Sequence, residues 1–408
     1  MNGLIITPQE TEGSRSEMLS DTTKDFSLML GGPLYQYFLR VGLVKPPLDR
    51  VGWRMITISM FAWAPLLVLA ALSGRLAGGA KIPFLRDFEV HARLLAALPL
   101  LIGAEVTISQ RIRVMLCQFV DRQVITPALV SKFERITESA LRLRNSAAIE
   151  LGLLALVFTA GIVWWRRILV IQSDTWYAST TAGGRVLTPA GYWYQFVSMP
   201  IIQFIALRWY FRLLIWARML WQVSRLDLNL VPSHPDRCCG LGFLGGIAAA
   251  LGPFLMAHSV LLSGFLADRI VYQGGRLPDY AAEIVAVALW LYILALGPTC
   301  VFAPRLQRRR REGLNSYGAL ASQYVIAFQK KWIEGQRPTD EPLVGSSDIQ
   351  SLADLANSFE VVQHVQPFPF GKPAIVAVAV YVAVPILPLS LTMFSLRELV
   401  TRLVHILL

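Results

Sequence analysis

Charged residues are scarce in this chain of 408 residues, of which only 16% are Asp, Glu, Lys or Arg. A soluble domain carries about 25%. Hydrophobic residues make up 54% of the chain. They come in runs of roughly 20, which is long enough to cross the hydrocarbon of a membrane as a helix. Backbone groups in lipid must be hydrogen-bonded within the chain, and the alternating pattern of a membrane barrel is absent. The sequence therefore predicts an all-α, polytopic membrane protein.

Cysteine is scarce too, and the common catalytic motifs are missing. The four cysteines, Cys117, Cys238, Cys239 and Cys300, do not have the spacing of a disulfide framework. We expect them near the cytoplasmic face and reduced. The chain starts without a basic segment followed by an apolar core, so no cleavable signal peptide is expected. It has no Gly-x-Ser-x-Gly elbow, no His-Glu-x-x-His and no Walker lysine motif. We therefore predict no catalytic residue, no metal and no cofactor.

The net charge of +11 could indicate a protein that binds nucleic acid. The basic residues are not interleaved with a nucleic-acid motif, so we expect no such partner. In membrane proteins, excess Lys and Arg collect in cytoplasmic loops. The segments 111–144 and 305–311 carry this excess. They predict a multi-pass protein of a bacterial inner (plasma) membrane with a cytoplasmic N-terminus. The expected partners are the bilayer and anionic lipid at the basic segments, and a homo-oligomer stays an open alternative.

Seven membrane spans are expected from the apolar runs. They lie at about 51–73, from Leu94 past Gln110, and at about 147–168, 193–226, 241–265, 281–303 and 373–393. The last contains Pro385 and Pro388, so it either crosses the membrane or re-enters on the same side.

The spans divide the chain into four predicted regions. Residues 1–50 form a mobile start followed by an interfacial helix. Residues 51–303 form a six-span domain that includes an amphipathic cytoplasmic helix at 127–144. Residues 304–372 form a cytoplasmic insert with two short helices, which would pack on each other or on 127–144. Residues 373–408 form the proline-broken last span and an interfacial C-terminal helix.

The loop at 169–192 is nearly uncharged and rich in Ser, Thr and Gly. Aromatic residues flank it, as is typical of the level of the lipid headgroups. We expect an aromatic belt at the non-cytoplasmic face, made of Trp176, Tyr177, Tyr192, Trp193 and Tyr194.

Ionisable residues inside the predicted spans are the first candidate site. At about 1.5 Å per residue, Glu105 and Arg208 lie at matching depths, and so do Arg54 and Glu150. Because buried charges are costly unless paired, these residues mark a pathway or an intramembrane pair. An alternative is that Arg54, Glu150 and Arg212 extend to the interface. Glu105 is too deep and too short for that.

The polar loop at 228–246 is the second candidate. His234, Asp236, Cys238 and Cys239 are metal-binding residue types, but adjacent cysteines chelate one ion poorly. Turn formation and capping of the fifth span by Asp236 explain the pattern without a metal. The glycines at 240–246 allow close helix approach. The special cytoplasmic loop is assigned to His234, Asp236, Arg237, Gly240 and Gly242.

Two stretches carry a resemblance. Pro-Ser-His-Pro-Asp-Arg-x-x-Gly-Leu-Gly-Phe-Leu-Gly at 232–245 and Asp-Ile-Gln-Ser-Leu-Ala-Asp-Leu at 348–355 resemble segments of a group of uncharacterised bacterial inner-membrane proteins. The resemblance covers the chain from the fourth span onwards and implies location, because the group has no agreed activity. Its members have small residues where Cys238 and Cys239 stand here, which further weakens a metal interpretation.

Three functions stay open at this stage. A channel or transporter for an ion or small solute is favoured by the intramembrane charges. A non-enzymatic scaffold or signalling protein would dock a cytoplasmic partner or anionic lipid through 127–144 and 304–372. A membrane enzyme would use His234 as acid and base, with Asp236 orienting it.

Overall fold

The computed structural model describes residues 26–28, 31–32, 51–161, 163, 174–181, 184–336 and 346–393, which are mostly helical. The predicted interfacial helices at 33–44 and 395–408 lie outside the described residues. The described α-helices are α4 (Val51–Leu72), α5 (Phe88–His91), α6 (Leu98–Asp121), α7 (Val130–Arg144), α8 (Ala147–Leu156), α10 (Pro189–Trp193), α11 (Met199–Ser224), α12 (Ile247–Ala250), α13 (Gly252–Gln273), α14 (Ala281–Leu296), α15 (Ala303–Phe328), α16 (Ser347–Gln363), α17 (Lys372–Ala383) and α18 (Leu387–Ser390).

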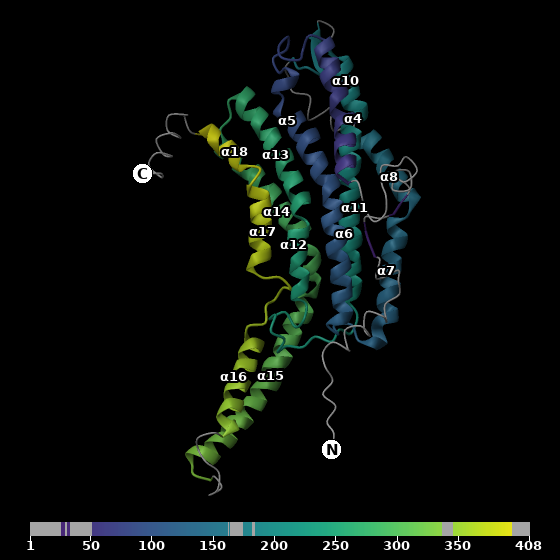
Figure 1. Ribbon diagram of the computed structural model, residues 1–408. Coiled ribbons are helices and arrows are strands. Elements are labelled where there is room, and N and C mark those ends of the chain that lie inside the picture. The colour runs from purple at the N-terminus through teal and green to yellow at the C-terminus, as the bar shows by residue number, and fades with distance from the viewer. Residues whose placement is uncertain are drawn as a thin grey trace.

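The long helices lie side by side in one elongated bundle (Figure 1). Helix α6 packs against α4 on one side and α13 on the other, and α13 in turn packs against α17. Helices α15 and α16 project together from one end of the bundle. We call this end, with α7, the loop 228–246 and the start of α15, the basic end.

Within the described residues, five helices are long and apolar enough to cross a membrane, and up to seven if two bent pairs each count as one span. The five are Val51–Leu72, Phe88–Asp121, Pro189–Ser224, Gly252–Gln273 and Leu277–Ile333. The predicted fifth span starts too early in the sequence. Residues 242–250 form a short 3₁₀ segment and α12 before the long helix begins at Gly252.

Two bent pairs of helices account for the difference between five and seven spans. Pro127–Arg144 meets Ala147–Gly161 at 46°, and Lys372–Ala383 meets Leu387–Met393 at 57°. The second bend lies at Pro385, where the sequence predicts an interruption. The predicted face of the helix at 127–144 is confirmed, because Phe133 and Ala140 are buried and the helix packs against α11.

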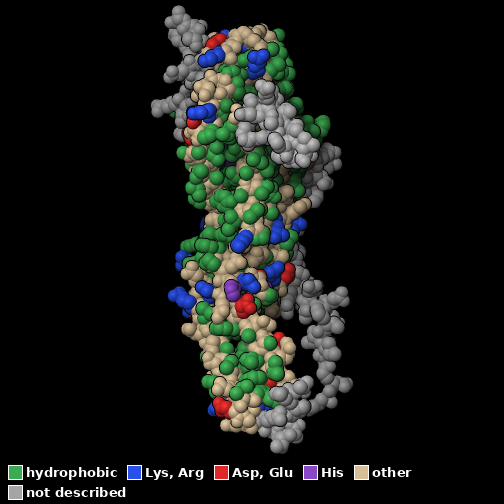
Figure 2. Space-filling view, turned by 90° about the vertical axis from the view of Figure 1, so that its left-hand side faces the viewer, with side chains coloured by type: hydrophobic (Ala, Val, Ile, Leu, Met, Phe, Trp, Pro, Cys, Tyr) green, Lys and Arg blue, Asp and Glu red, His purple; other side chains and the backbone are tan. Residues whose placement is uncertain are grey.

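Hydrophobic side chains form a broad belt in the upper part of the molecule, and Lys and Arg gather below it (Figure 2). The 34-residue helix Phe88–Asp121 is about 51 Å long, well beyond the ~30 Å of hydrocarbon. The 36-residue helix Pro189–Ser224 is similarly long. These two helices therefore extend past the belt into the basic end.

The predicted packing of the two insert helices on each other is confirmed by α15 and α16. The insert is not separate from the sixth span, because only a 3₁₀ segment, Gly297–Phe302, stands between α14 and α15. Near the tip of this arm, the Asp348 carboxylate accepts hydrogen bonds from Lys331 Nζ (2.7 Å) and Trp332 Nε1 (2.9 Å). These bonds lower the pKa of Asp348.

The opposite end corrects two expectations. The strands β1 (Ala178–Thr181) and β2 (Gly184–Leu187) pair antiparallel within the predicted loop. Trp176, Tyr177 and Tyr194 are buried in protein instead of forming a lipid-facing belt. Trp176 donates a hydrogen bond to Asp87 (2.7 Å) and packs edge-on against Phe84. These contacts hold the ring inside the protein and away from the lipid headgroups. At the basic end, Phe26 and Leu28 are buried, although residues 1–30 were expected to be mobile.

Helix α13 approaches α5 closely at Gly264. A Cβ atom at Gly264 would lie 2.6 Å from the Ala92 Cβ and 3.2 Å from the Glu89 Cα. We predict that Gly264→Ala lowers the unfolding temperature in detergent, because overpacking costs about 1–3 kcal/mol. The control is Gly152→Ala on α8, where a Cβ meets nothing within 4 Å. Helix propensity alone favours alanine by about 1 kcal/mol at an exposed helix position. Equal effects of the two substitutions would contradict the close packing.

Candidate functional site

A carboxylate shared by two arginines lies at the lower end of the hydrophobic belt. Glu105 of α6 forms an ion pair with Arg54 of α4, and its other oxygen accepts from Arg212 Nη1 of α11 at 2.8 Å. The side chains of Arg54 and Arg212 are each only 4% exposed, and that of Glu105 is 12% exposed. One buried carboxylate thus joins three long helices.

A second ion pair continues this network on α11. The Nε atom of Arg208, one turn before Arg212, lies 3.4 Å from Glu150 Oε1 near the start of α8. We call these five residues, Arg54, Glu105, Glu150, Arg208 and Arg212, the charge network. Counted over these five residues, the network holds three guanidiniums and two carboxylates, an excess of one positive charge.

The sequence matched the four predicted residues by depth into two acid/base pairs, and the structure combines them differently. It matched Glu105 with Arg208 and Arg54 with Glu150, whereas the structure pairs Glu105 with Arg54 and Arg208 with Glu150. The rise per residue gives the height of a side chain along a helix but not the direction in which it points. The alternative in which Arg54 and Arg212 extend to the interface does not fit, because both turn towards Glu105.

A second polar cluster lies nearer the opposite end. Arg93 donates hydrogen bonds to the carboxylate of Glu89 and to the hydroxyl of Tyr194. Nearby, the Asp268 carboxylate of α13 accepts from the backbone N–H groups of Phe88 (3.0 Å) and Glu89 (3.1 Å), at the start of α5. A carboxylate at this helix end satisfies exposed donors and suits the helix dipole. Sequence reasoning missed this cluster, although the i,i+4 spacing of Glu89 and Arg93 was a signal for part of it.

Buried polar groups lie between these two clusters. Ser198 Oγ donates to the Ala62 carbonyl of α4 at 2.7 Å. Ser59 of α4 is 2% exposed, and its Oγ has no hydrogen-bond partner among the described residues. We call the row Arg93, Tyr194, Ser198, Ser59 and the charge network the polar track. Along the continuous helix Phe88–Asp121 it extends about 18 Å, from Arg93 to Glu105.

Asp236 organises the loop at 228–246. Its carboxylate accepts from the backbone N–H groups of Cys238 (2.8 Å), Gly240 (3.1 Å) and Gly242 (2.9 Å). Gly242 begins the 3₁₀ segment that leads into α12, so Asp236 caps this segment, whereas the sequence predicts that it caps the spanning helix, which begins only at Gly252. His234 Nδ1 lies 2.9 Å from the same carboxylate, and the His234 side chain is 33% exposed.

The other loop residues connect the loop to its neighbours. Gln366, which precedes α17, donates its backbone N–H to the carbonyl of Arg237 at 2.8 Å. Gly240 has φ +95°, a conformation that side chains rarely adopt. Burial, with the nearby Asp236 charge, raises the pKa of Cys238 and of Cys239 to about 12. Both thiols are therefore protonated at neutral pH, the form that binds metals poorly. Among the described residues, no group of three or more His, Cys, Asp or Glu could hold a metal ion.

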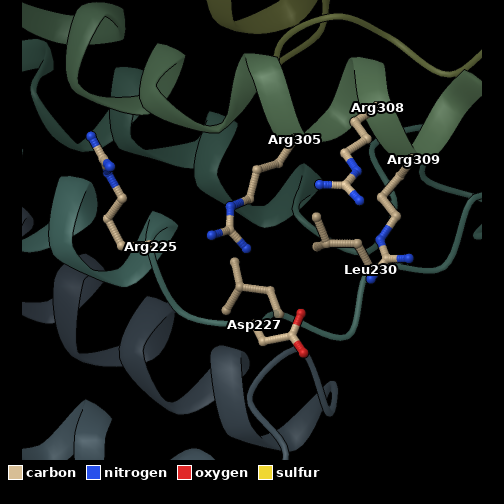
Figure 3. A pocket seen from close by; sticks show the side chains of 7 residues that line it. Arg225, Asp227, Leu230, Arg305, Arg308 and Arg309 are labelled. Carbon is tan, nitrogen blue, oxygen red and sulfur yellow. The ribbon is translucent and has the colours of Figure 1, made fainter.

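A basic pocket of about 300 Å³ lies beside this loop, between the end of α11 and the start of α15 (Figure 3). Sequence reasoning treated its arginines as topology signals only. The sequence alone does not show that residues about 80 positions apart line the same pocket. The pocket is lined by Arg225, Asp227, Leu228, Leu230, Arg305, Arg308 and Arg309.

Comparisons with family models, curated proteins and solved structures found no match to this chain. The resemblance at 232–245 and 348–355 therefore stays a prediction, and the function has to be argued from the site itself.

The pairing in the charge network can be tested by a double-mutant cycle. We predict that Glu105→Gln and Arg212→Gln are each strongly destabilising, because removing one partner leaves a buried charge, at a cost of about 3–5 kcal/mol. Their effects should couple by about 1–3 kcal/mol, since contacting residues are not additive. The control cycle combines Glu105→Gln with Arg208→Gln and should couple less. Thermal unfolding in detergent measures both cycles, and stronger coupling to Arg208 would refute the observed pairing.

Proposed function

We propose that the protein is a channel or transporter that moves a small ion or solute across a membrane. The polar track is the observation that supports this proposal. It follows the interface of α4, α6 and α11, three of the helices long enough to span, and it ends at the charge network. Ionisable groups in such a position are costly, and they commonly mark ion or proton pathways.

The sign of the network favours an anion. Among the described residues, the network holds three guanidiniums against two carboxylates, an excess of one positive charge. In a low dielectric, that charge attracts an anion far more strongly than it would in water. Arg54 and Arg212, which share Glu105, are also positioned so that either of them can exchange this carboxylate for a passing anion. The proposed role of the network is a binding point or gate at the lower end of the track.

The proposed topology has seven spans in a bacterial inner membrane, with the N-terminus and the basic end in the cytoplasm. Both bent pairs then contribute one span each. The concentration of Lys and Arg below the hydrophobic belt supports this orientation, because basic residues are retained on the cytoplasmic side.

A docking function is the second candidate, favoured by the surface of the α15–α16 arm. The arm projects from the bundle (Figure 1) and exposes large apolar side chains away from the α15–α16 contact. These include Leu320 (50% exposed), Ile326 (55%) and Ile333 (73%). An arm of this kind could present a partner-binding surface at the basic end.

Of the three functions considered, the geometry gives least support to a membrane enzyme. The Asp236 carboxylate, expected to orient His234, already accepts three backbone hydrogen bonds that fold the loop. Its main role is therefore that of a capping group.

Flux through purified protein in liposomes tests the proposed function. We predict measurable flux of a small anion. Counted per folded protein, because Glu105→Gln is destabilising, this variant should change the flux about tenfold or more, since a neighbouring charge at low dielectric exceeds the ~1.4 kcal/mol that a tenfold change requires. Glu283→Gln is the matched control, since Glu283 is an exposed acid in the first turn of α14. The control should keep the wild-type rate.

Two outcomes would count against the proposal. Folded wild-type protein that carries no common anion, cation or small solute above protein-free liposomes would contradict transport and leave the docking function. If Glu105→Gln leaves the flux unchanged, the protein is still a transporter, but the charge network does not lie on its transport path.

A further inference from the structure

The basic pocket brings arginines from two distant segments to one cavity. Arg225 comes from the end of α11, whereas Arg305, Arg308 and Arg309 come from the first two turns of α15 (Figure 3). Asp227 is the one acidic residue among those that line it, and its carboxylate lies at the wall opposite α15. The lining therefore carries four positive charges and one negative charge.

The contacts of these arginines leave donors available. Arg305 donates to the Leu226 carbonyl, and Arg225 stacks over the ring of Trp221. Arg308 and Arg309 share Glu312, at 2.8 Å and 3.0 Å. In the part of the chain that the structure describes, Asp227 forms no ion pair with any of the four. A guanidinium has five N–H donors, so these contacts use only a fraction of them.

Glu312 and Asp227 together do not neutralise the pocket. Four guanidiniums at one cavity repel one another, and the repulsion is relieved when an anion enters between them. Arginine matches phosphate better than it matches a monatomic anion, because its planar fork makes two parallel charge-assisted hydrogen bonds to two oxygens. A cavity of about 300 Å³ can hold a phosphate group together with part of what it is attached to.

We propose that this pocket binds a phosphate oxyanion, carried either by an anionic phospholipid headgroup or by a soluble phosphorylated molecule. Its position suits both sources. Phe302 ends the apolar run of α14 and its 3₁₀ extension, and Arg305 follows three residues later, about 5 Å along the helix axis. That level is where headgroups meet water. The site is separate from the charge network and does not depend on the proposed transport function.

Binding to the full-length protein in neutral detergent tests the site. Short-chain phosphatidic acid represents the lipid source, and inorganic pyrophosphate represents the soluble source. Native mass spectrometry counts bound lipid, and calorimetry follows pyrophosphate. We expect saturable binding of at least one probe with one site per chain. Phosphatidylcholine of the same chain length should not compete. Binding of phosphatidic acid alone assigns the site to lipid, and binding of pyrophosphate assigns it to a soluble phosphate.

Three variants test whether binding depends on this pocket or only on the overall positive charge of the helix. Arg308→Gln should weaken binding about tenfold, and it should fold normally because that side chain is 77% exposed. Asp227→Asn should strengthen binding several-fold, because it removes the negative charge in the lining. Arg311→Gln, in the same arginine run but outside this pocket, should leave the affinity unchanged.

Three outcomes would contradict phosphate binding in this pocket. The absence of saturable binding to both probes would overturn the proposal. So would equal weakening by Arg308→Gln and Arg311→Gln, which would reduce the effect to the charge of the helix. Unchanged affinity in Asp227→Asn would show that the phosphate does not bind in this pocket.

Discussion

The shared carboxylate of Glu105 is the interaction on which the membrane part of this protein depends. Charges taken out of water must be paired, because the desolvation of even one costs several kcal/mol. Arg54, Glu105 and Arg212 come from α4, α6 and α11, so satisfying one residue fixes the rotation and height of three helices. Arg208 and Glu150 extend the same constraint to α8. A network of this kind specifies one arrangement among many that apolar surfaces alone would allow.

The rest of the architecture follows from the level at which this network lies. Arg54 and Glu150 are near the starts of α4 and α8, so both helices begin at the lower edge of the hydrophobic belt. Helices α6 and α11 continue below it and pack with α7 and the loop organised by Asp236. Gly313 of α15 fits against Pro232 of this loop and Val362 of α16, which joins the arm to the bundle. Membrane helices, loop and arm are thus one continuous body.

The sequence allowed the helical class, most of the spans, the amphipathic face of α7 and the pairing of α15 with α16 to be predicted. Each of these rests on a periodicity or a run length that a linear sequence displays. The partners of Glu105 could not be predicted, because helix rotation is decided by packing among several helices. Trp176 and Tyr194 were assigned to an interface by composition, but Asp87 and Arg93 offered them buried partners. The basic pocket was hidden because Arg225 and Arg305 meet only once α11 and α15 are packed.

The proposed transport function requires a hydrated path along the interface of α4, α6 and α11 that ends at the charge network. Cysteine accessibility in liposomes tests it most directly, in a protein whose four native cysteines are replaced. We predict that Ser59→Cys reacts with a small charged thiol reagent, because Ser59 lies on the polar track. Ile56→Cys should not react, since that side chain is 58% exposed on the hydrophobic belt and would face lipid. An unreactive Ser59→Cys, with the protein folded, would contradict the path and leave the network as a purely structural clamp.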